Sequence, residues 1–218
     1  MNDELYVLPL VVRIERATPP ERTDALEAAA MAVLSLLDDP GEWTGELHAW
    51  QSTGKIRKVV RRARGAEWRR AVGLPGRTIE HRTAEVRVHP PVPLDDWPRD
   101  LARLQVSGTE LADTVAPGPA APPILWANPA LEMSAGKAMA QAGHAAQLAW
   151  WASDAGERAA WREHGLALSV RTAAAPDFEA RVAAGLPVVR DAGFTEIEPG
   201  SCTFVADAPW LLGRVTRA

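Results

Sequence analysis

The sequence predicts an α/β protein: a three-layer α/β/α domain with a mixed β-sheet in the C-terminal half, preceded by a degenerate repeat of the same fold. Three observations predict this class. Strand-like and helix-like segments alternate along the chain, a proline-rich segment at 115–123 divides it, and the two sides share an order of elements. A length of 218 residues suits one large domain or two of about 100 residues each.

The N-terminal half begins with an apolar stretch at Val7–Ile14 that suits a strand, followed by an alanine- and leucine-rich helix at Arg22–Leu37. We expect a further strand near Ile56–Arg62, a helix from Glu67 and a strand at Ala84–Val88. This alternation indicates a mixed or parallel sheet that is covered by helices.

The segment at 115–123, VAPGPAAPP, holds four prolines and a glycine. Proline fixes φ and has no amide hydrogen, so the segment suits neither a helix nor a central strand. We expect it to be a linker between a domain at 1–114 and a domain at 124–218.

The C-terminal half repeats the alternation of the first half. It also shares landmarks with it, since a tryptophan precedes a strand in each half and a Gly-Leu-Pro tripeptide ends a helix in each, which indicates a tandem duplication. The expected elements are a strand at Ile124–Ala127, a helix at Ser134–Ala152, a strand at Ala167–Thr172, a helix at Asp177–Ala184, a short strand around Val188–Asp191 and a strand at Ser201–Ala206.

A basic run stands out in a chain whose net charge is −4. Residues 55–70 hold eight Lys or Arg and one acid, Glu67. Such a run is typical of phosphate binding, and it is equally compatible with a solvated face that nearby acids neutralise. The candidate phosphate contacts are Lys55, Lys58, Arg61 and Arg62.

The compartment follows from the N-terminus and the cysteine content. The first residues place acids ahead of a short apolar run, which matches neither a signal peptide nor a membrane span. The single cysteine, Cys202, excludes an intrachain disulfide and a cysteine-rich metal site, as suits a reducing compartment. We expect a cytoplasmic protein without membrane contact.

The first candidate site is the segment Met133–Ala149, which begins with a potential N-cap, Ser134. Lys137, Gln141 and His144 follow at spacings that place all three on one helix face. An ammonium, an amide and an imidazole in this arrangement could bind an anion or polarise a carbonyl while the imidazole serves as a base. An exposed polar stripe with a hydrogen-bonded histidine would give the same spacing.

The second candidate site is the segment Asp191–Thr203, DAGFTEIEPGSCT. Its two glycine turns can present Asp191, Thr195, Ser201 and Thr203 at neighbouring loop and strand ends, where sites in α/β sheets gather. A turn-rich connection whose polar side chains cap local backbone groups is the alternative.

The two segments together, in this order and at this separation, resemble the type 2 (archaeal/eukaryotic-type) peptidyl-tRNA hydrolases. That family has a Met-x-x-Gly-Lys-x-x-x-Gln-x-x-His-Ala helix and, about fifty residues later, an Asp-Ala-Gly-x-Thr-x-Ile-x-Pro-Gly-(Ser/Thr)-x-Thr segment. The matching residues here are Met133, Gly136, Lys137, Gln141, His144 and Ala145, and then Asp191, Ala192, Gly193, Thr195, Ile197, Pro199, Gly200, Ser201 and Thr203. The resemblance covers residues 124–209.

The resemblance implies hydrolysis of the ester that joins a peptide or N-acyl-aminoacyl group to the terminal ribose of tRNA. It implies Lys137, His144, Asp191 and Thr195 as the catalytic set, with Gln141, Ser201 and Thr203 as supporting, substrate-binding positions. His144 or Asp191 could activate the water while Lys137 stabilises the oxyanion. We expect no cofactor and no metal, because no acid and histidine cluster has ligand spacing in the sequence.

The chain departs from the family pattern at several places. Ala142 and Gly143 replace the Cys-rich sequence that is common after the family's glutamine, and we expect no consequence from this change. The strand at Ile124–Asn128 lacks the arginine that is usual there. Two alternative functions therefore remain. The chain could keep the fold without catalysis, as a tRNA- or protein-binding module, or it could act on another aminoacyl ester.

The N-terminal half has no Lys, Gln or His on the corresponding face of its helix at Arg22–Leu37, so we expect it to be catalytically inactive. Because the related hydrolases are generally homodimers, a degenerate copy could act as a built-in partner. We therefore expect a monomeric pseudo-dimer or a homodimer, in which the basic run grips the phosphates of tRNA.

Overall fold

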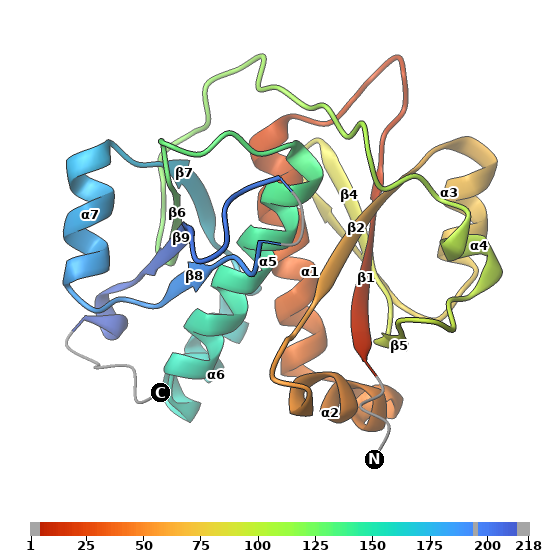
Figure 1. The fold of residues 1–218 in the computed structure, drawn as a ribbon, viewed down its shortest axis with the longest axis horizontal. Helices are drawn as coiled ribbons and strands as arrows, with labels where there is room; N and C mark the ends of the chain where they lie inside the picture. The colour runs from red at the N-terminus through yellow and green to blue at the C-terminus, as the bar shows by residue number, and fades with distance from the viewer. Residues whose placement is uncertain (1–4, 194–195, 213–218) are drawn as a thin grey trace.

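The computed structural model describes residues 5–193 and 196–212 and contains two β-sheets with helices around them (Figure 1). The N-terminal half consists of β1 (Tyr6–Arg13), α1 (Arg22–Asp38), a 3₁₀ turn (Gly41–Trp43), α2 (Thr44–Ser52), β2 (Lys58–Ala63), α3 (Gly65–Val72), β3 (Arg77–His81), β4 (Ala84–Val88), β5 (Val92–Pro93) and α4 (Arg99–Ala102). The C-terminal half consists of β6 (Ile124–Ala127), α5 (Ala135–Ala152), α6 (Ala155–Glu163), β7 (Ser169–Thr172), α7 (Ala175–Ala183), β8 (Val188–Arg190), β9 (Cys202–Asp207) and a 3₁₀ turn (Pro209–Leu211).

The two sheets have the same topology. The strand order is β2-β1-β4-β3 in the first and β7-β6-β9-β8 in the second, and β5 adds to β1 at its start. The pairs β1/β2 and β6/β7 are parallel, while the other pairs are antiparallel. The expected α/β class with mixed sheets is confirmed, and the halves have the repeat-like arrangement that the sequence predicts.

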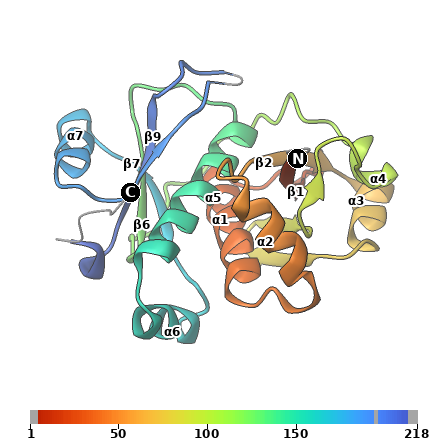
Figure 2. The ribbon, with the colours of Figure 1, turned by 60° about the horizontal axis from the view of Figure 1, so that its bottom comes forward.

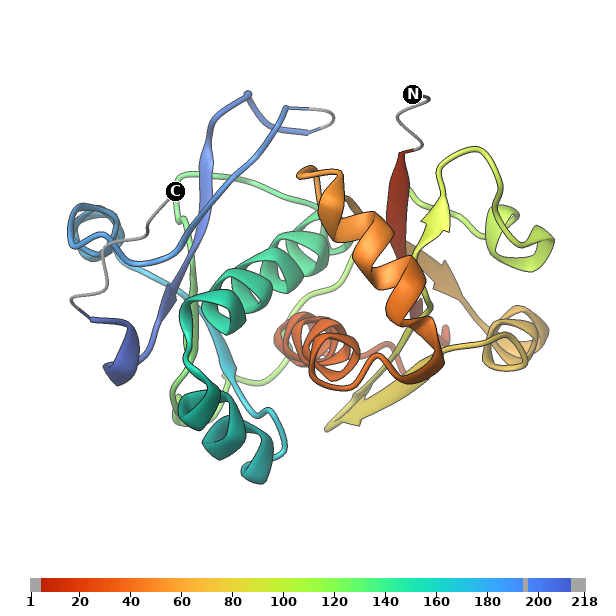
Figure 3. The ribbon, with the colours of Figure 1, turned by 90° about the horizontal axis from the view of Figure 1, so that it is seen from below.

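Helices α1 and α5 pack against each other between the two sheets (Figures 2 and 3). Helix α7 covers the outer face of the C-terminal sheet, and α3 and α4 lie on the outer side of the N-terminal sheet (Figure 3). Both central helices are rich in buried alanine, and small side chains let helix axes approach closely. One hydrophobic core therefore runs through both halves, and a second, smaller cluster lies under α3 and α4.

The two landmark tryptophans make the same hydrogen bond in the two halves. Trp50 Nε1 donates to the Arg57 carbonyl at 2.8 Å, and Trp161 Nε1 donates to the Ala167 carbonyl at 2.8 Å. Each bond holds the chain just ahead of the parallel strand of its half. Both tryptophans lie in helices, α2 and α6, that the sequence analysis did not expect.

The segment ahead of the expected linker touches the start of both central helices. The amide of Thr23 donates to Asp113 Oδ1 at 2.8 Å, and the amide of Ala135 donates to the Thr109 carbonyl at 3.2 Å. Residues 115–123 contain no helix or strand and are mostly exposed. Among the described residues, no helix is both long and apolar enough to cross a membrane.

Candidate active site

The N-terminus of α5 is capped as the sequence predicts. Ser134 Oγ accepts a hydrogen bond from the amide of Lys137 at 3.2 Å. The carboxylate of Glu196 in turn accepts from the amide of Ser134 at 2.8 Å and from its hydroxyl at 2.7 Å. The loop that follows β8 is therefore fastened to the helix that carries the first motif.

A polar network joins the two motifs. Lys137 Nζ lies 2.6 Å from Asp191 Oδ1, and Gln141 Nε2 donates to the same oxygen at 2.9 Å. Gln141 Oε1 accepts from Thr203 Oγ1 of β9 at 2.8 Å. The side chains of Lys137 and Asp191 are only 12% and 7% exposed, so their ion pair is largely shielded from water. The alternative of an exposed polar stripe does not hold for Lys137 and Gln141.

The loop after β8 presents Asp191 by its backbone geometry. Gly193 has φ of 75°, and a Cβ atom there would lie 2.3 Å from Pro199 Cγ, so only glycine fits. The amide of Gly193 donates to Asp191 Oδ2 at 2.9 Å. Gly200 donates to the carbonyl of Asp191 at 2.7 Å, and the amide of Asp191 donates to the Ser201 carbonyl at 2.9 Å. The loop is thus closed on itself around the carboxylate.

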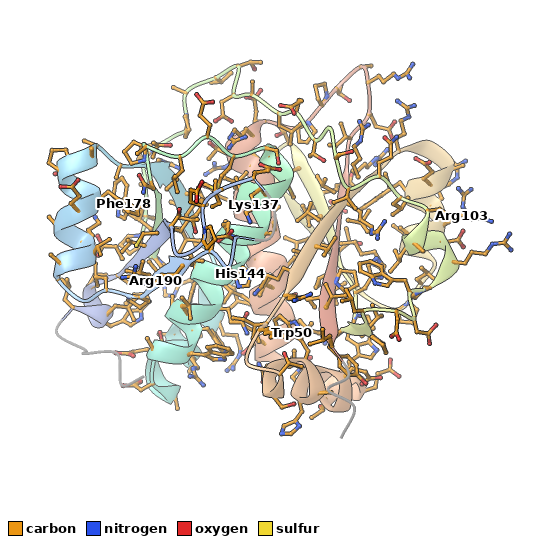
Figure 4. All side chains as sticks on the ribbon, in the orientation of Figure 1. Trp50, Arg103, Lys137, His144, Phe178 and Arg190 are labelled. Carbon is orange, nitrogen blue, oxygen red and sulfur yellow. The ribbon has the colours of Figure 1, made fainter. Side chains whose placement is uncertain are left out.

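His144 lies farther along α5, on the side that faces the N-terminal half (Figure 4). Its Nδ1 is 3.1 Å from Nζ of Lys58 in β2, and Lys58 Nζ donates to Gln147 Oε1 at 2.5 Å. Burial lowers the pKa of His144 well below its usual value, and the positive charges of Lys58 and Lys137 lower the pKa further. Burial also lowers the pKa of Lys58 well below its ordinary value.

Gln147 is a site residue that sequence reasoning missed. It follows His144 by three residues, a spacing that places it on the same face of α5, so the helical period alone could have found it. The contact of Lys58 with His144 had no such signal, because it joins β2 to α5, two elements that are far apart in the sequence.

The basic run does not form one exposed surface. Lys55 is exposed, whereas Lys58 is buried and enters the site. Arg61 Nη1 donates to the carbonyls of Ala102 and Leu104, and Arg62 Nη2 donates to the side chain of Gln105. The expectation that all four candidate residues lie ready for phosphates is therefore wrong for Lys58, because its ammonium turns inward.

Two further residues, Thr195 and Ser201, were expected at the site. Thr195 lies outside the described residues. Ser201 is half-buried and contributes its backbone carbonyl, which holds the amide of Asp191.

The N-terminal half has an ion pair of reversed polarity at the corresponding place. Asp24 follows the N-cap of α1 by three residues, as Lys137 follows that of α5. Arg82 directly follows β3, as Asp191 directly follows β8, and its Nη1 lies 3.3 Å from Asp24 Oδ1. The acidic residue thus lies on the helix and the basic residue on the loop. In the C-terminal site the lysine lies on the helix and the aspartate on the loop.

Three groups with metal-ligand chemistry, from Asp24, Glu27 and His81, lie within 4.8 Å of one another in this region. Sequence patterns did not indicate this cluster. Its carboxylates already pair with Arg82 and Arg171, so guanidinium groups supply the positive charge that a cation would bring. We interpret the cluster as a buried ion-pair network.

No curated protein and no solved structure gives a significant match to this chain. A family model does match its C-terminal part, over a range that includes the whole Lys137–Gln141–Asp191–Thr203 network. Residues 124–216 match the model of peptidyl-tRNA hydrolase PTH2, which confirms the family resemblance that the two motifs predict.

Proposed function

We propose that this protein hydrolyses the ester between a peptide, or an N-acyl-aminoacyl group, and the terminal ribose of tRNA. The observation that carries the proposal is the intact network of Lys137, Gln141, Asp191 and Thr203 inside the part that matches the family model. The products are free tRNA and a carboxylic acid.

The chemistry of the site suits this reaction. The ammonium of Lys137, in the first turn of α5, is positioned to stabilise the negative charge that develops on the ester carbonyl oxygen. Asp191 Oδ2 accepts one hydrogen bond that the structure shows, from Gly193, and a carboxylate oxygen has room for a second, from water. His144 and Asp191 are the two residues of the set whose side-chain chemistry suits a general base for that water.

The N-terminal half, 1–114, is in this proposal a degenerate copy of the same domain that serves as a built-in partner. The shared sheet topology and the packing of α1 on α5 support a pseudo-dimer within one chain. A homodimer of such chains is the alternative assembly. The exposed part of the basic run, which includes Lys55, Arg64, Arg69 and Arg70, would then bind tRNA phosphates in a salt-dependent way.

The test is release of free tRNA from N-acetyl-aminoacyl-tRNA by the purified full chain. We expect cleavage by the wild type and a fall of at least about a hundredfold in Lys137→Ala and in His144→Ala. His164→Ala is the matched control, because His164 is exposed and its ring contacts only its own helix, at the Ala160 carbonyl.

Two outcomes would contradict the proposal. Salt-dependent tRNA binding without cleavage would identify a non-catalytic binding module on the same fold. Cleavage of other aminoacyl esters, with none of N-acetyl-aminoacyl-tRNA, would identify a related enzyme with a different substrate.

A further inference from the structure

The N-terminal half extends one side chain into the site of the C-terminal half. Lys58 of β2 is only 8% exposed, and its Nζ lies against His144 and Gln147 of α5. Within residues 5–193 and 196–212, no carboxylate forms an ion pair with it. Burial of a lysine ammonium with no acid beside it costs free energy unless other groups around it accept its hydrogen bonds.

The other partners of Lys58 are all suited to a cation. Nζ lies 2.5 Å from Gln147 Oε1, 3.5 Å from the Ile56 carbonyl and 4.9 Å from the centre of the Trp50 ring, whose face attracts positive charge. An ammonium has three donors and no acceptor. In its ammonium form Lys58 is therefore the donor in its contact with His144, and Nδ1 of the imidazole is the acceptor.

This direction determines the state of the imidazole. A neutral histidine has one donor and one acceptor nitrogen, so a ring that accepts at Nδ1 carries its proton at Nε2. A protonated ring would place two positive groups 3.1 Å apart in a buried place. His144 is thus a neutral ring that can donate through Nε2 and has no free lone pair with which to take a proton from water.

The sequence makes room for this lysine. A Cβ atom at Gly143 would lie 3.3 Å from Lys58 Cδ and 3.0 Å from Val33 Cγ2 of α1. The glycine directly before His144 therefore lets the lysine stem cross α5. The departure from the family pattern at Gly143, from which no consequence was expected, coincides with the path of Lys58.

We propose that Lys58, supplied by the N-terminal half, is a positioning residue of the active site, which holds His144 as a neutral hydrogen-bond donor and leaves Asp191 to receive the proton of the attacking water. The water oxygen then bonds to the ester carbon as one proton passes to Asp191. The bond between the ester carbon and the ribose oxygen then breaks, and the ribose oxygen takes the proton from Asp191. The catalytic part of this inference rests on the proposed function, whereas the Lys58–His144 part does not.

Two lysines act on His144, and an acid is paired with one of them. Lys58 lies on β2, Lys137 lies on α5, and Asp191, in the loop after β8, is paired with Lys137. Both lysines oppose protonation of the ring. Removal of Lys58 alone should therefore make the imidazole easier to protonate, with Lys137 and Asp191 still in place.

The first experiment reads the imidazole directly by ¹H–¹⁵N NMR of the full chain, labelled at its five histidines. A His144→Gln variant identifies the signals of His144. We expect the wild type to show the Nε2–H tautomer, with a pKa well below that of an ordinary histidine. In Lys58→Met the ring should titrate at a higher pH, and in Lys58→Arg, which keeps the charge, it should resemble the wild type.

Lys55→Met is the matched control, since it removes an exposed lysine from the same run and should leave His144 unchanged. Thermal unfolding of each variant verifies that the protein is folded. An Nδ1–H tautomer in the wild type, or identical titration of His144 in the wild type and Lys58→Met, would overturn the role of Lys58.

The second experiment tests the donor role by hydrolysis of N-acetyl-aminoacyl-tRNA. Glutamine can donate a hydrogen bond but cannot act as a base, so His144→Gln should retain at least about ten times the activity of His144→Ala. Equal loss in both variants would overturn the donor role. Absence of hydrolysis in the wild type would overturn the proposed function, while the NMR result would still decide whether Lys58 controls His144.

Discussion

Gly143 shows how one residue can determine both packing and chemistry. It lies where α5 meets α1 and β2, and an added methyl group would press on Val33 and on the stem of Lys58. We expect Gly143→Ala to lower the free energy of unfolding by about 1–3 kcal/mol, because the side chains of Val33 and Lys58 must shift to admit the extra carbon. The measurement is chemical denaturation.

The control for that prediction is Gly45→Ala. Gly45 lies in α2, and a Cβ atom there would meet no atom within 4 Å. This change should be neutral or stabilising, since alanine favours the helix. Equal destabilisation by both substitutions would show that the space around Gly143 is not the cause.

His89 makes stability depend on pH. Burial lowers its pKa to about 4, below the ordinary 6.5, while its Nδ1 bonds to the Pro75 carbonyl at 2.7 Å. The unfolded chain therefore binds a proton at a higher pH than the folded chain does. The stability that His89 contributes is complete above about pH 6.5 and is lost as the pH falls toward 4, by about 3 kcal/mol in all.

We expect the free energy of unfolding of His89→Asn to fall less steeply than that of the wild type between pH 6.5 and 4. The asparagine amide can keep the donor to the Pro75 carbonyl but does not titrate. His144, whose pKa is lowered in the same direction, contributes a remaining slope in both proteins. Parallel curves for the two proteins would contradict the assignment to His89.

The residues of the site were predictable from the sequence to different extents. Lys137, Gln141 and Asp191 were identified because two motifs together resemble a known family, and the structure brings these residues together. Lys58 was identified only as a surface cation. Its inward direction follows from the packing of β2 against α5, which local sequence does not encode.

At the scale of elements, the two short helices before the parallel strands act as anchors. Trp50 of α2 and Trp161 of α6 each bond the carbonyl just ahead of β2 and β7. We expect Trp50→Phe and Trp161→Phe each to cost about 1–3 kcal/mol of stability, since each change removes this hydrogen bond and part of a buried indole ring. Trp151→Phe is the control, because Trp151 is 42% exposed; an equal cost there would contradict the role of the bond.

Sequence patterns predicted both central helices, α1 and α5, and several strands, but they missed α2, α6 and β3. The strand at Ala84–Val88 and the strand at Ile124–Ala127 have the expected bounds. Helix α6 was missed although Asp154 and Glu157 form a capping box at its start, which is a readable signal. β3 was missed because its RTIEH sequence is partly exposed and polar, so no apolar period marks it.

On the scale of the whole molecule, the halves are joined by a shared core and by a buried acid. Glu27 of α1 is fully buried, and its Oε1 accepts from the amide of Val170 at 2.9 Å and from Arg171 at 3.0 Å, both in β7. Its Oε2 binds His81 and Arg82 of the N-terminal half. The same carboxylate thus ties the reversed ion pair of one half to the sheet of the other.

We expect the halves to unfold as one cooperative unit, because α1 and α5 would each expose an apolar face if the halves separated. Glu27→Ala leaves the largely buried guanidinium of Arg171 without its carboxylate and the amide of Val170 without its acceptor, and should cost about 3 kcal/mol. The measurement is hydrogen exchange against denaturant, followed in β1 and in β6. Both strands should lose protection at the same denaturant concentration. Glu27→Ala should lower that concentration equally for both strands, whereas Glu46→Ala, at an exposed position of α2, should leave it unchanged. If β6 lost protection well before β1, the C-terminal half would be an independent unit. Folding of that half would then not by itself bring Lys58 to the site.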